Sequence, residues 1–193
     1  MKIVLVHGFN VKDKGARTVD TLVPFIRNAG HEVDTDEGDY GYFNIWMVRF
    51  TKSKTRQRVL HRLAKAFETA DVVITHSNGA NFFTQAADML DINYNNKLMV
   101  IHISPALDCD SEIPMSVKQQ LVLCTTHDKA VKASSLLLLH PWGRMGAKGY
   151  QGSDNRNTNV KDDSIPGHSD WFKAGFLTST WGHCARFIQE HTK

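Results

Sequence analysis

The sequence lacks long apolar runs, and this absence excludes proteins that cross a membrane by a helix. No stretch approaches the roughly 18 uninterrupted apolar residues that such a helix needs,. The apolar run at the start, Ile3 to Val6, is interrupted by His7 and Gly8. A secretory signal has a longer apolar core and a small-residue cleavage site. We therefore interpret this run as a first strand and expect the protein to remain in the cytoplasm.

Cysteine is also scarce, and the chain has neither repeats nor low-complexity segments. The three cysteines, Cys109, Cys124 and Cys184, are an odd number without the spacing of metal ligands. A disulfide framework is therefore not expected, and the pattern is typical of a reducing compartment. We expect no metal and no cofactor. The net charge of +3 over 193 residues does not by itself indicate an anionic partner,.

Apolar runs of strand length alternate with helical patterns along the chain. Strands are expected at 2–6, 32–35, 71–75, 97–103, 120–125 and 157–161, and helices at 19–30, 55–70, 79–90, 129–139 and from about 179,. Pro24 is expected to kink the first helix. The run 45–50 fits either a strand or a buried loop. The alternation predicts a mostly parallel sheet with helices on both faces, in one α/β domain spanning residues 1–193.

The stretch VVITHSNGANFF, residues 72–83, places Ser77 between a strand and a helix. In a parallel sheet, functional groups gather at the carboxyl ends of the strands. A side chain on such a turn projects away from the sheet, and the N–H groups that begin the helix favour developing negative charge nearby. Ser77 therefore has the position of a nucleophile whose product is an oxyanion. The alternative is a serine that only caps the helix.

The run Thr75-His76-Ser77-Asn78-Gly79 resembles the nucleophile elbow of the α/β-hydrolases, normally written Gly-x-Ser-x-Gly,. Thr75 departs from the first glycine of that motif. The resemblance covers almost the whole chain. It implies a three-layer α/β-hydrolase fold with no cap domain, because the usual insertion point, 104–119, is short. It also implies a minimal, lidless serine esterase or lipase that needs no interfacial activation.

The resemblance also implies a catalytic triad in the chain order Ser, Asp, His. Asp128 follows the strand 120–125, where the family usually places its acid, and His168 lies in a loop before the last helix, where the family places its base. Two alternatives stay open for the acid. Asp108 follows the preceding strand, and Asp128 could instead cap the helix after it. His127 is the nearest rival to His168 as the base.

An acyl-transfer site also needs two hydrogen-bond donors aimed at the oxyanion. The backbone N–H of Asn78, directly after the nucleophile, is one candidate. The sequence His7-Gly8-Phe9-Asn10 resembles the His-Gly oxyanion motif of lipases and esterases, which implies the backbone N–H of Phe9 as the second donor. His7 is then expected to brace the loop. The aromatic and glycine-containing segments 36–43 and 140–152 are either rims of this site or plain surface loops.

A basic run crosses the predicted helix 55–70 and consists of Arg49, Lys52, Lys54, Arg56, Arg58, Arg62 and Lys65. Much of it falls opposite the apolar residues Leu60 and Leu63, which predicts a solvated helix face. The alternative is a surface for acidic membranes, nucleic acid or an anionic substrate. No motif that reads a nucleic-acid groove accompanies the run, so nucleic acid is not an expected partner.

These residues together predict a serine hydrolase that cleaves a carboxylic ester, a thioester or an amide through an acyl-enzyme on Ser77. The expected partner is a small-molecule acyl substrate. Acyl chain length and oligomeric state stay open. The alternative is a catalytically inactive binding protein on the same scaffold, which Thr75 and the choice between Asp128 and Asp108 keep open.

Overall fold

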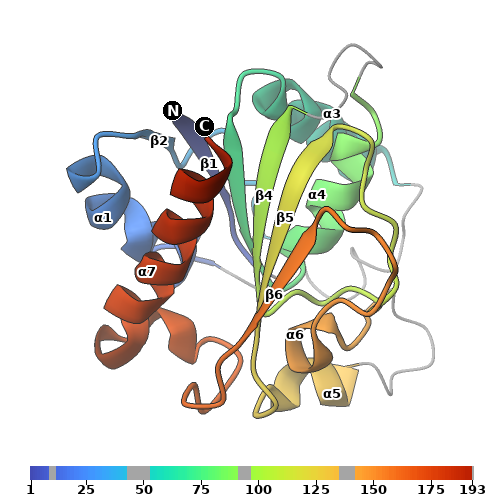
Figure 1. Ribbon diagram of the computed structural model, residues 1–193. Coiled ribbons are helices and arrows are strands. Elements are labelled where there is room, and N and C mark those ends of the chain that lie inside the picture. The colour runs from blue at the N-terminus through green and yellow to red at the C-terminus, as the bar shows by residue number, and fades with distance from the viewer. Residues whose placement is uncertain (9–11, 43–52, 91–96, 135–141, 193) are drawn as a thin grey trace.

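The computed structural model describes residues 1–8, 12–42, 53–90, 97–134 and 142–192. In this part of the chain six strands form one sheet in the order β2-β1-β3-β4-β5-β6 (Figure 1). Every pair of neighbouring strands is parallel. The predicted parallel sheet is therefore confirmed. The strands are β1 (Lys2–Val6), β2 (Glu32–Asp34), β3 (Val72–His76), β4 (Leu98–Ile103), β5 (Val117–Cys124) and β6 (Asn157–Lys161).

The central strands are mostly apolar and largely buried because helices cover both faces of the sheet,. All residues of β3 and β4 are buried, whereas the edge strand β6 is half-buried or exposed throughout. Side chains alternate between the two faces, as the pleat of a strand requires. In β1, Ile3 and Leu5 belong to one apolar cluster, and Val4 and Val6 belong to the other.

Two groups of helices form the outer layers (Figure 1). Apolar residues of α3 (Lys54–Phe67) and α4 (Gly79–Ala87) pack in the cluster with Val4 and Val6. Those of η1 (Val19–Leu22), α1 (Val23–Asn28), η3 (Asp170–Phe172) and α7 (Ala174–His191) pack in the cluster on the opposite face. No helix in the described ranges is long and apolar enough to cross a bilayer.

The carboxyl ends of the strands meet at the lower edge of the sheet in Figure 1, where α5 (Lys129–Ser134) and α6 (Met145–Lys148) also lie. The loops that follow β1, β3, β4 and β5 therefore converge at this edge. In open parallel sheets this is the edge where ligands bind. The residues predicted to carry function follow β1, β3, β5 and β6, so the topology brings these loops to one end of the molecule.

Some predicted elements differ from the observed ones. The helix expected at 19–30 is divided into η1 and α1, and Pro24 lies in the first turn of α1. A backbone N–H is not needed in a first turn, so Pro24 does not interrupt a helix there. The last helix begins at Ala174, about one turn before the predicted start. The short helix α6 was not predicted, and the run 45–50 lies outside the described residues.

Candidate active site

Ser77 lies on a tight turn between β3 and α4. Its backbone has φ +53°, in the left-handed region that non-glycine residues rarely occupy,. Such a conformation costs about 1–3 kcal/mol and persists only where the surroundings enforce it. Here the Ser77 N–H donates to Ile103 O at 3.2 Å, and Ser77 O accepts from Ala106 N–H at 3.1 Å. The end of β4 therefore holds the turn, and the half-buried serine stands at the carboxyl edge of the sheet.

Gly79 allows α4 to approach β1 closely. A Cβ atom at this position would lie 2.5 Å from His7 O and 2.7 Å from Val6 O, both rigid backbone atoms. The loop after β1 also runs close to the turn, since a Cβ on Gly8 would lie 3.1 Å from Ser77 Cβ. The His-Gly segment therefore abuts the serine. Phe9, the predicted second oxyanion donor, lies outside the described residues, so its role stays a prediction.

Thr75 occupies the first glycine position of the elbow motif and has a partner there. Its hydroxyl lies 2.7 Å from His102 Nδ1, and both side chains are buried. Gln120 hydrogen-bonds His102 in turn and donates to Asn157 Oδ1 at 3.0 Å. If Thr75 donates to Nδ1, His102 carries its proton on Nε2 and donates to the amide oxygen of Gln120. One consistent series of donors and acceptors then crosses the sheet from β3 to β6.

The structure brings His168 and Asp128 together across 40 residues of sequence. His168 Nδ1 lies 2.7 Å from Asp128 Oδ2, and the side chains are 18% and 0% exposed. A carboxylate can only accept here, so Nδ1 carries the proton, and Nε2 is the ring nitrogen that Asp128 does not engage. Asp128 Oδ1 also accepts from Val131 N–H at 3.0 Å. The carboxylate therefore both caps α5 and orients His168.

The sequence left two alternatives open, Asp108 as the acid and His127 as the base, and their surroundings differ from those of Asp128 and His168. Asp108 and His127 are both exposed. In the described part of the chain, the ion-pair partner of His168 is Asp128. Asp128, in contrast, is completely buried and has both oxygens in hydrogen bonds. The geometry therefore favours Asp128 over Asp108 as the acid and His168 over His127 as the base.

His76, directly before the serine, packs against His168 and was not singled out by sequence reasoning. Their ring centroids are 4.8 Å apart, and His76 Nε2 lies 3.4 Å from His168 O. Burial lowers the pKa of His76 well below its ordinary value, and the nearby His168 acts in the same direction. Nδ1 of His76 has no hydrogen-bond partner among the described residues. These contacts favour a neutral ring that donates from Nε2 to the His168 carbonyl.

His7 braces the loop after β1, as expected. Its Nδ1 lies 2.9 Å from Gly8 O, and its Nε2 lies 3.1 Å from Asp39 Oδ1. Tyr40 stacks on the His7 ring at 4.1 Å and donates its hydroxyl to Gly8 O at 2.5 Å. The segment 36–43, whose end lies outside the described residues, thus contributes Asp39 and Tyr40 to the support of the loop. It is more than a plain surface loop.

The other proposed rim, 140–152, also reaches the turn. Trp142 is buried and donates from Nε1 to Asn78 Oδ1 at 2.7 Å. Residues 140 and 141 lie outside the described ranges. The first described residue of this segment, Trp142, is therefore packed against the residue after the serine. Sequence reasoning could place the segment only near the site, because this contact joins residues 64 positions apart.

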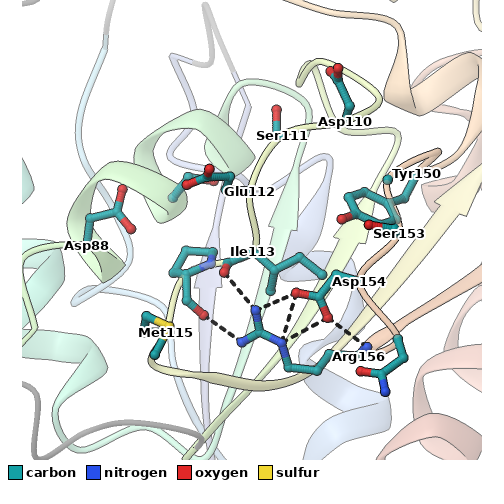
Figure 2. Close-up of a pocket in the computed structure, with 14 residues that line it drawn as sticks. Asp88, Asp110, Ser111, Glu112, Ile113, Met115, Tyr150, Ser153, Asp154 and Arg156 are labelled. Carbon is teal, nitrogen blue, oxygen red and sulfur yellow. Dashed lines mark hydrogen bonds and ion pairs between the residues drawn. The ribbon is translucent and has the colours of Figure 1, made fainter.

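A hollow of about 1030 Å³ lies apart from the predicted site residues (Figure 2). It is lined by residues of α4 and of the loops before β5 and β6. None of Ser77, Asp128 and His168 lines it. Within it Arg156 donates to the carbonyl oxygens of Ile113 and Pro114 and pairs with a carboxylate of the same wall. The Arg156 side chain therefore binds the loops that line the hollow. No group of residues suited to holding a metal ion occurs in the described ranges.

The basic run is only partly a solvated helix face. Arg58, Arg62, Lys54 and Lys65 are exposed on α3, as predicted. Arg56 is the exception, since only 1% of it is exposed. Its guanidinium lies 4.8 Å from the centre of the Phe82 ring and donates to Gln85 Oε1 at 3.0 Å. Arg49 and Lys52 lie outside the described residues.

Comparison with known proteins confirms the fold. No protein-family model and no curated protein matches the chain. Several solved structures, in contrast, match the chain over most of its length. A monoacylglycerol lipase of Paleococcus ferrophilus matches with a TM-score of 0.61 at 12% identity, over 99% of this chain and 95% of the other. An extracellular α/β-hydrolase of a Paenibacillus species matches with a TM-score of 0.58 at 10% identity, over 100% of both chains. An esterase of Pyrococcus furiosus matches with a TM-score of 0.58 at 10% identity, over 98% of this chain and 80% of the other. The chain has the α/β-hydrolase fold.

Proposed function

We propose that this protein is a serine hydrolase that cleaves a carboxylic ester, a thioester or an amide through an acyl-enzyme on Ser77. The observation that carries the proposal is the 2.7 Å contact between His168 Nδ1 and the buried Asp128 carboxylate. This pair lies at the same edge of the sheet as Ser77. Further support comes from the likeness of the fold to a lipase and an esterase. The substrate is a small-molecule acyl compound.

In the first half of the reaction, Ser77 Oγ attacks the carbonyl carbon of the substrate, and His168 Nε2 takes the hydroxyl proton. The carbonyl oxygen becomes an oxyanion, which the backbone N–H groups of Asn78 and Phe9 stabilise. The tetrahedral intermediate then collapses. The bond to the leaving group breaks, and His168 returns the proton to that group. The acyl group remains on Ser77.

In the second half, water attacks the acyl-enzyme and His168 accepts a proton from it. The oxyanion forms again at the same two N–H groups. Collapse of this intermediate breaks the bond to Ser77 Oγ, which regains its proton from His168. The products are a carboxylic acid and the free enzyme. Asp128 does not take a proton in either half; it holds the imidazole in the right tautomer and stabilises the imidazolium.

Hydrolysis of p-nitrophenyl esters of short and long acyl chains tests the proposal. The wild type should turn over at least one chain length, and that length then reports the acyl preference. Ser77→Ala should reduce kcat by about 10⁶-fold, since the nucleophile is removed. Its thermal unfolding should remain close to that of the wild type. Equal turnover by wild type and Ser77→Ala would refute the assignment. Absence of turnover on every acyl substrate would favour a binding protein on this scaffold.

A further inference from the structure

The Asn78 side chain is joined to a residue 64 positions away in the sequence. Its Oδ1 atom accepts a hydrogen bond of 2.7 Å from the indole Nε1 of Trp142. The two residues are only 1% and 8% exposed. Leaving a buried donor or acceptor without its partner is costly, because water is not available as a substitute. The pair is therefore expected to keep one geometry.

Trp142 begins a segment, 142–149, that is fixed to two strand ends. Gly146 N–H donates to Pro105 O at 2.8 Å, and Gly146 O accepts from Thr125 N–H at 3.0 Å. These bonds attach the segment to the loop after β4 and to the end of β5. A side chain on such a platform is held more accurately than one on a free loop. The indole N–H therefore has a defined direction.

The same segment lies against the acid of the proposed triad. A Cβ atom on Gly146 would stand 2.9 Å from Asp128 Oδ2, so the absence of a side chain leaves room for the carboxylate. Trp142 and Gly146 thus face two parts of the site. One contacts the residue after the nucleophile, and the other contacts the partner of His168. A movement of this segment would therefore disturb both the contact with Asn78 and the contact with Asp128.

In the proposed mechanism Asn78 supplies its backbone N–H to the oxyanion, and Trp142 binds the side chain of that same residue. Asn78 has φ −65° and ψ −17°, directly after the left-handed Ser77 at φ +53°. The direction of its N–H depends on the peptide plane between these two residues. An oxyanion donor must point at the place where charge develops, and a small misplacement lowers the rate. A tether on the side chain restricts rotation of that plane.

We infer that Trp142 is a positioning residue for the oxyanion hole and acts through the side chain of Asn78. The inference rests on the proposed function, since it concerns the same site. The indole does not contact the reacting atoms. It fixes Asn78 so that the backbone N–H meets the oxyanion. Removing one oxyanion donor outright costs about 10²–10³ in rate, so a donor that is present but loosely held should cost less, about tenfold.

A double-mutant cycle tests the inference with a p-nitrophenyl ester that the wild type hydrolyses. Trp142→Phe keeps an aromatic ring and removes the N–H; Asn78→Ala removes the acceptor and keeps the backbone N–H. Each single variant should lower kcat about tenfold with KM within about twofold. The double variant should be no slower than the slower single variant, because both changes break one bond. Affinity for an alkyl boronic acid, which forms a tetrahedral adduct, should fall with kcat.

Two results would overturn the inference. One is a Trp142→Phe variant with kcat within about twofold of the wild type; the other is a double variant whose loss is the product of the two single losses. If Trp142→Phe does not fold, Asn78→Ala breaks the same bond with a smaller loss of volume. An unchanged kcat in that variant would then overturn it.

Trp171→Phe is the matched control for loss of a buried indole bond. Trp171 is 0% exposed and donates from Nε1 to Ser104 Oγ at 2.9 Å. This variant should lose stability as Trp142→Phe does and keep kcat within about twofold. A wild type that turns over no acyl substrate refutes the proposed function, and the inference with it. If the wild type is active and Trp142→Phe is equally active, only the inference is refuted and the proposed function stands.

Discussion

The hydroxyl of Thr75 lies 2.7 Å from Nδ1 of His102, in register between the neighbouring strands β3 and β4. Thr75 stands where the elbow motif of the α/β-hydrolases carries a glycine. The buried hydroxyl is therefore part of a polar connection through the sheet. Thr75 is 0% exposed and His102 1%, so water cannot replace either partner. The departure from the motif therefore has a structural counterpart, the hydrogen bond between Thr75 and His102.

Thr75→Val should lower stability by about 1–3 kcal/mol, because it keeps the shape and leaves His102 Nδ1 without its donor. Urea unfolding measures the change. Thr158→Val is the control, since Thr158 is an exposed threonine on the edge strand β6. It should alter stability by less than about 0.5 kcal/mol. Equal stability of Thr75→Val and the wild type would show that the Thr75–His102 bond contributes nothing.

Stability should fall as pH falls, because His102 is kept neutral in the fold. Burial lowers the pKa of His102 from 6.5 to about 3, against a smaller opposing effect of Gln120. The unfolded chain therefore binds a proton between these two values that the folded chain does not. Stability from this group is complete above the unfolded pKa and is lost as pH falls below it. Between about pH 7.5 and about pH 4.5 the loss is about 2–3 kcal/mol.

The measurement is urea unfolding of the wild type and of His102→Gln at both pH values. The variant does not titrate at this position, so its stability should fall less between the two conditions. Asp20, whose pKa burial raises to about 6, acts in the opposite direction but is present in both proteins. The difference between the two slopes therefore isolates His102. Parallel slopes would contradict the neutral, buried state of this ring.

Asp128→Asn should lower kcat/KM by about 10³–10⁴-fold, because the imidazole of His168 loses the carboxylate that selects its tautomer. Asp108→Asn is the matched change at the rival acid. Asp108 is exposed, so this variant should stay within about twofold of the wild type,. Initial rates on one ester decide between them. The opposite pattern, with Asp108→Asn inactive and Asp128→Asn active, would transfer the role to Asp108.

Gly79→Ala should destabilise the protein by at least about 2 kcal/mol, since its Cβ would lie 2.5 Å from His7 O and neither backbone can yield easily,. Gly182→Ala makes the same chemical change inside α7, where no atom lies within 4 Å of the new Cβ. That variant should gain about 0.5–1 kcal/mol from the better helix propensity of alanine. Thermal unfolding measures both. A well-tolerated Gly79→Ala would contradict the close approach of α4 to β1.

Local signals explain which elements the sequence could predict. The strand and helix around Ser77 follow from an apolar run, a polar turn and a renewed helical pattern, all within the stretch 72–83. Pro24 was misinterpreted because the pattern around it continues across two helices, so the first turn of α1 looked like the middle of one. The start of α7 was placed late because Thr178, Ser179 and Thr180, which are weak helix formers, follow its first turn,.

Long-range contacts explain what the sequence could not predict. Arg56 is buried against Phe82, although the helical pattern alone places it among solvated charges. The contact of Trp142 with Asn78 and that of His76 with His168 each join distant segments. No spacing rule in the sequence marks such pairs. Asp128 and His168, in contrast, could be proposed because a known chain order guided the choice.

The most direct test of the central claim is the intact mass of the folded protein after treatment with a fluorophosphonate, which reacts with activated serines. The proposal predicts one adduct on the wild type, mapped to Ser77 and absent from Ser77→Ala. His168→Ala should be labelled far more slowly, because the serine loses its base. An unlabelled, folded wild type, or an adduct that persists in Ser77→Ala, would contradict the claim that Ser77 is the nucleophile.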